Sequence, residues 1–168
     1  MRYHRPHIGA NGSRYLMIRR APFDDASRPD ERHRRSRTMN EQSAIQFLTT
    51  VRKPLLTLHK AILDHERKDY EREFGPVTPA AFLQVLINGS GFRWLMPFST
   101  VIANVDETLD AKDASPDDRI GAAQGVAALF SGEESAEFYE RYQALLQASP
   151  DILHLHGTVA PLLNALKN

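Results

Sequence analysis

Cysteine is absent from the 168-residue sequence, which excludes disulfide bridges, thiol catalysis and metal sites built on thiolates. No run of about eighteen apolar residues occurs, so we expect no transmembrane helix. The basic N-terminus lacks the apolar stretch of a signal peptide, because Tyr15-Leu16-Met17-Ile18 is only four residues long. These absences favour a cytoplasmic protein without a membrane partner.

Motifs for common enzyme chemistry are missing as well. The sequence contains no GxxxxGK[ST] phosphate loop and no GxGxxG, and Gly89-Ser90-Gly91 lacks the strand and helix that flank a nucleophile elbow. No segment alternates apolar and polar residues with a period of two. We therefore expect no cofactor and no β-sheet, and we lean against an enzyme.

The sequence has no net charge overall, because 21 basic residues balance 21 acidic ones, but the two signs are unevenly distributed. Residues 1–38 carry ten arginines and four acids, a net charge of 10 − 4 = +6, and the remaining chain carries 11 − 17 = −6. This division predicts a disordered arginine-rich arm over 1–38, which is either a solvated tail or upstream sequence from a misplaced start codon. The run from Arg32 to Arg37 suits nucleic acid, but without a folded reading element it gives only nonspecific affinity.

The body of the chain, 39–168, predicts a single all-α domain, an irregular bundle of five to seven helices. Apolar residues recur there at helical spacing. Pro54 can either stand in the first turn of a new helix or kink one long helix, and we prefer two closely joined helices, the second of which ends at Gly75-Pro76. Thr78-Pro79 and Ser115-Pro116 mark helix starts, each a capping residue followed by proline. The expected helices span 41–52, 54–74, 79–87, 97–110, 118–130, 133–149 and 152–166.

Polar side chains occupy the face of the 54–74 helix that should be buried. At 100° per residue, Glu66, Tyr70 and Glu73 fall within about 60° of His59. His156 lies on the apolar stripe of the last helix. One hypothesis is that His59, Glu66 and His156 form a metal-binding or hydrolytic site. The alternative is structural: His59 pairs with Glu66 or a backbone carbonyl, and the helix end around Glu73 leaves the core.

Trp94 and Phe98 begin a continuous apolar stripe that continues to Leu109. A tryptophan at such a junction usually anchors a core, but together with the 54–74 helix it also makes a candidate groove. Our leading interpretation is therefore a non-enzymatic interaction or dimerisation module that uses this groove, with a homodimer or another protein as the partner. The metal-binding or hydrolytic bundle is the alternative.

Three segments carry a resemblance to a known family, namely LHKAILDHERKDYEREFGPV, FLQVLI and FRWLMPFSTVIANVDETLD. They resemble a family of small uncharacterised all-helical bacterial proteins, in which a Tyr-Glu…Gly-Pro-Val block precedes a Trp-Leu-x-Pro-[Leu/Phe]-Ser block. The resemblance covers residues 39–166 and implies a helical fold and bacterial origin, without catalytic residues. This chain has Asn88-Gly89 where the resemblance implies a His-Asp turn, which puts any site built on that turn in doubt.

Overall fold

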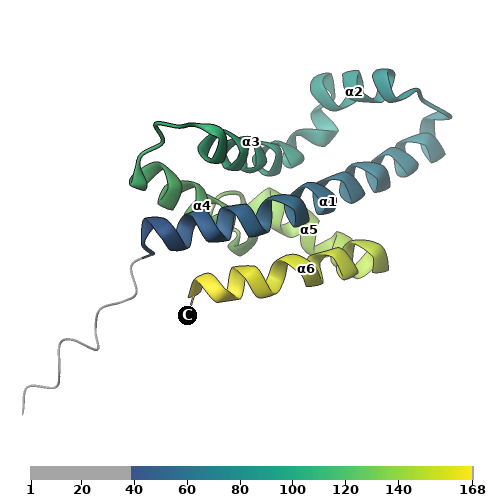
Figure 1. The fold of residues 1–168 in the computed structure, drawn as a ribbon. Helices are drawn as coiled ribbons and strands as arrows, with labels where there is room; N and C mark the ends of the chain where they lie inside the picture. The colour runs from purple at the N-terminus through teal and green to yellow at the C-terminus, as the bar shows by residue number, and fades with distance from the viewer. Residues whose placement is uncertain (1–38, 168) are drawn as a thin grey trace, which may run out of the picture. The chain divides into compact units, whose positions relative to one another are not determined.

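The computed structural model describes residues 39–167, and in that range the chain is all-α, with no strand (Figure 1). The prediction of an irregular bundle of five to seven helices is confirmed by six α-helices and one 3₁₀ helix. The predicted arm lies outside the described residues. The elements are α1 Glu41–Phe74, α2 Pro79–Asn88, the 3₁₀ helix η2 Ser90–Leu95, α3 Met96–Asp110, α4 Pro116–Ser131, α5 Ala136–Ala148 and α6 Pro150–Lys167.

Capping residues set several of the helix starts. The Thr78 side chain accepts a hydrogen bond from the backbone N–H of Ala81 at the start of α2, with 3.2 Å between oxygen and nitrogen. Ser115 and Asp118 form a reciprocal capping box at the start of α4. Each side chain satisfies a backbone group that the first turn of a helix leaves free, so these starts follow from the local sequence.

The prediction of two helices separated at Pro54 is wrong, because α1 is one helix of 34 residues with Pro54 in its interior. A proline inside a helix costs about 3 kcal/mol. Val51 and Leu55, on either side of it, are almost fully buried on the same stripe. Each such side chain gains about 1.5–3 kcal/mol on burial, so packing on both sides of Pro54 outweighs the lost hydrogen bond.

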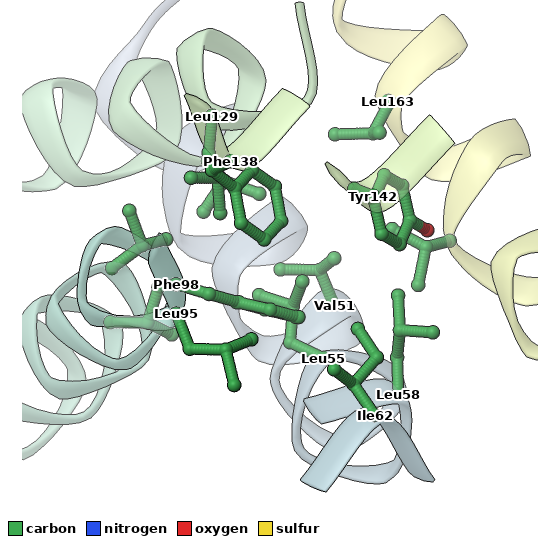
Figure 2. Close-up of a cluster of buried hydrophobic side chains, with 14 of the residues drawn as sticks. Val51, Leu55, Leu58, Ile62, Leu95, Phe98, Leu129, Phe138, Tyr142 and Leu163 are labelled. Carbon is green, nitrogen blue, oxygen red and sulfur yellow. The ribbon is translucent and has the colours of Figure 1, made fainter. Parts of the chain in front are cut away.

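α1 is the central element of the bundle, with α3 and α4 packed along one side and α6 along another (Figure 1). Side chains from α1, α3, α4, α5 and α6 meet in one core (Figure 2). Its largest members are aromatic: the rings of Phe98 and Phe138 meet edge to face at 5.5 Å, and Phe138 stacks on Tyr142 at 5.4 Å. Within the described part of the chain, no helix has the length and apolar composition needed to cross a bilayer.

Candidate binding groove

A groove with a volume of about 310 Å³ opens between α1, α2, η2 and α3. Its rim exposes three large apolar side chains, Leu83 by 53%, Ile87 by 66% and Met96 by 63%. The only polar side chains in its lining belong to His59 and Ser99. The lining residues are His59, Leu63, Leu83, Leu86, Ile87, Phe92, Leu95, Met96 and Ser99. A concave apolar surface with few polar groups is typical of a binding site.

The wall formed by α2 is attached to the rest of the protein by a single buried side chain. Phe82 is the only buried residue of α2. Its ring lies 5.9 Å from the ring of Tyr70 on α1 and 5.7 Å from the ring of Phe92 on η2. Tyr70 also packs on Phe74, with the ring centres 4.7 Å apart. This aromatic cluster places α2 beside the C-terminal part of α1 and leaves Leu83, Leu86 and Ile87 of α2 to line the groove.

Hydrogen bonds fix the connection between α1 and α2. Arg67 donates to Glu71 at 3.0 Å and to the backbone carbonyl of Val77 at 2.5 Å. The backbone N–H of Val77 in turn donates to the same Glu71 carboxylate at 3.2 Å. This bond, together with Arg67, lowers the pKa of Glu71. Sequence reasoning missed this clamp, because the charges of this helix face read as ordinary solvated i to i+4 pairs.

His59 and Ser99 form the polar part of the groove. The Nε2 atom of His59 and the hydroxyl oxygen of Ser99 are hydrogen-bonded at 3.0 Å, and the imidazole meets the ring of Phe98 edge to face at 5.1 Å. Burial lowers the pKa of His59 from its ordinary value of 6.5, so the ring is neutral near pH 7. A neutral imidazole beside a hydroxyl can act as a base toward a nucleophile, but among the described residues His59 has no carboxylate as a hydrogen-bond partner to orient its ring. The pair therefore satisfies itself inside an apolar surface.

The structure does not gather the other predicted polar residues around His59. Glu66 is half-buried, and burial raises the pKa of its carboxyl. Tyr70 belongs to the aromatic cluster under α2. Glu73 is exposed on the last turn of α1, so the structural alternative, in which this helix end leaves the core, is confirmed and the prediction of a buried position is wrong. The same alternative expected His59 to pair with Glu66 or a backbone carbonyl, whereas its partner is Ser99. The polar line along α1 therefore separates into independent local environments.

His156 is hydrogen-bonded to Tyr142, and this pair is separate from the pair formed by His59 and Ser99. The hydroxyl of Tyr142 and the Nδ1 atom of His156 are hydrogen-bonded at 2.8 Å, and their rings meet at 5.7 Å. Burial raises the pKa of Tyr142 and lowers that of His156, so both groups are neutral near pH 7. Among residues 39–167, no group of three His, Cys, Asp or Glu side chains could hold a metal ion. His59, Glu66 and His156 thus do not assemble as the metal hypothesis requires.

The prediction that a tryptophan at this junction anchors the core is confirmed, whereas the expectation that Trp94 and Phe98 line the groove is wrong. Both are buried in the core, where Trp94 stacks on Phe138 with 6.1 Å between ring centres. The guanidinium of Arg141 lies 5.6 Å from the centre of the Trp94 ring. The groove is lined by the residues between them in sequence, Leu95 and Met96.

A larger hollow of about 550 Å³ lies between α3 and α4, but its chemistry is less specific. Its charged lining residues are the acids Glu107, Asp113, Asp117 and Asp118. Hydrogen bonds from Ser115 lower the pKa of Asp118, which is occupied as part of the capping box. The other three carboxylates are exposed to solvent. We therefore place the candidate site in the groove beside α2.

Comparisons of the chain with protein-family models, with curated proteins and with solved structures found no match. The resemblance to small helical bacterial proteins consequently stays a prediction.

Proposed function

We propose that this protein is an interaction module whose groove binds an uncharged, apolar helix of another protein chain. The observation that carries the proposal is the exposure of Leu83, Ile87 and Met96 around a groove that has no charged lining residue. Contiguous apolar surface of this kind marks binding sites on water-soluble domains.

The walls of the groove favour a helical occupant. Leu83 and Ile87 are four residues apart on α2, and Met96 lies across from them at the start of α3. A helix that lies in such a groove inserts side chains at i, i+3 or i+4, and i+7. Full burial of one such side chain is worth about 1.5–3 kcal/mol, so covering the exposed half of each would contribute about 1 kcal/mol per residue.

Polar atoms inside the groove also favour an apolar occupant over a polar ligand. Because the hydroxyl of Ser99 and the Nε2 atom of His59 already bond to each other, an apolar side chain can cover these two atoms without leaving either of them unpaired. The alternative function, a metal-binding or hydrolytic bundle that uses His59, Glu66 and His156, has less support. In the described part of the chain, His59, Glu66 and His156 lie in three separate local environments.

Methyl NMR tests the proposal, because Met96 lines the groove, whereas Met39 packs against the core just before the start of α1 and is not among the lining residues. The protein, labelled with ¹³C at its methionine methyl groups, is titrated with a synthetic helical peptide of leucine, alanine and glutamine that has leucine at i, i+4 and i+7. We expect the Met96 signal to shift and the Met39 signal to stay fixed, and a scrambled peptide to shift neither. A Met96 signal unchanged at millimolar peptide would contradict the proposal.

A further inference from the structure

We infer that the helix bound in the groove is α2 of a second copy of this chain, so that each copy places its α2 against the groove of the other. This inference rests on the proposed function and names its partner. The groove requires an uncharged helix with exposed apolar side chains one turn apart. The described part of the chain itself presents such a helix.

α2 meets that requirement better than any other described helix. Pro79–Asn88 contains no Asp, Glu, Lys, Arg or His, whereas every other helix among residues 39–167 has at least one. Leu83 and Ile87 protrude from α2 at a spacing of four residues. The other large apolar side chains exposed in this range are Leu56, Phe74, Met96 and Leu153, and each stands on a helix that carries charge.

Leu83 and Ile87 line the groove of their own copy and also protrude from α2, and we call these two side chains the ridge. This arrangement suits a twofold axis. In a twofold dimer the same patch is used by both copies, and a side chain near the axis faces its own counterpart. A charged residue there would meet its like charge, which opposes pairing. Leu83 and Ile87 would instead meet apolar side chains, so two copies of α2 can pack without electrostatic repulsion.

α2 stays attached to its own copy, and this attachment favours reciprocal pairing of the two copies over a loose contact. Phe82 anchors α2, and the hydrogen bonds of Val77 with Arg67 and Glu71 fix the connection that precedes it, so the ridge is presented on a formed helix before a partner arrives. Binding a preformed helix avoids the entropic cost of folding it on the partner. Because the contact is reciprocal, the two copies of α2 bury their ridges in one event.

A matched pair of leucines tests the inference. Leu83 of α2 and Leu153 of α6 are the same residue type, and their exposed fractions are 53% and 51%. We expect light scattering of the full chain at tens of micromolar to give twice 19.0 kDa. Leu83→Asp should weaken the dimer at least about ten-fold, whereas Leu153→Asp should leave it unchanged. Circular dichroism checks that both variants keep the helical fold, which their exposure allows.

Single-cysteine variants locate the contact, since the natural sequence has no cysteine. Under mild oxidation, Leu83→Cys should form a covalent dimer much faster than Leu153→Cys. Equal rates, or a 19.0 kDa species at hundreds of micromolar, would overturn the second-copy occupant. The Met96 titration then separates the two failures, because a monomer whose groove still binds the helical peptide retains the proposed function and takes its helix from a different chain.

Discussion

Replacing Phe82 and Phe98 separately with alanine would measure how independently α2 is attached. The two side chains are alike in type and burial, with 5% and 0% of their surfaces exposed. Phe98 belongs to the central core, whereas Phe82 packs only in the aromatic cluster that joins α2 to α1 and η2. We expect Phe98→Ala to lower the free energy of unfolding by about 3–5 kcal/mol, the usual cost for a core phenylalanine.

The expected cost of Phe82→Ala is smaller, because it cannot exceed what the docking of α2 contributes to the native state. Phe82 is the only buried side chain of α2, and burial of one phenylalanine is worth about 2–3 kcal/mol before the cost of ordering the helix. We therefore expect a loss of about 1–2 kcal/mol in unfolding free energy. Amide hydrogen exchange in α2 should accelerate about ten-fold, while exchange in α1 should change much less.

Denaturant unfolding followed by circular dichroism gives the two free energies, and hydrogen exchange read by mass spectrometry gives the local opening of α2. If Phe82→Ala costs as much as Phe98→Ala, α2 belongs to the cooperative core. That result would contradict the interpretation that the groove wall formed by α2 is attached mainly through Phe82.

Three further predictions concern protonation, capping and backbone conformation. Burial lowers the pKa values of His59 and His156 below their ordinary 6.5, so the unfolded chain binds more protons than the folded one and stability should fall as pH drops below 6.5. Urea titrations at pH 7 and pH 5.5 measure this loss of stability, and His59→Gln should reduce it. Ser115→Ala removes the capping box of α4 and should cost about 1 kcal/mol by the same titration, and an unchanged midpoint would show that the cap is dispensable. Gly132→Ala should lower the free energy of unfolding by more than about 1 kcal/mol, because φ is 85° at this position and the new Cβ would lie 3.1 Å from the Tyr139 ring. Gly121→Ala, inside α4 with free space around it, should instead raise the free energy of unfolding by about 0.5–1 kcal/mol.

Helix starts were predictable from the sequence because their causes are local. Thr78-Pro79 and Ser115-Pro116 mark the starts of α2 and α4, where the Thr78 and Ser115 side chains bind backbone N–H groups three residues ahead. Pro54 misled the prediction because its effect depends on distant packing. Val51 and Leu55 are held by helices that follow much later in the chain, and this tertiary packing overrides the local preference for a break.

The candidate site was only partly predictable, because a helical period gives the direction of a side chain and not the extent of the core. His59 and Glu73 share a face of α1, but the core ends before Glu73, which is exposed. The exposed ridge of α2 did leave a signal in the sequence. PAAFLQVLIN has apolar residues on all sides and no charge, so a helix of this composition between two turns exceeds what one buried face can use.

α1 and α6 are the first and last helices of the described chain, and they pack against each other in the core. During synthesis, α1 is therefore complete well before its packing partner exists. The 75 residues between them, 75–149, take roughly 4–15 seconds to translate at about 5–20 residues per second. For that interval the apolar stripe of α1 is open on the side that α6 will cover, so this surface is accessible to chaperones and to aggregation until the last helix emerges.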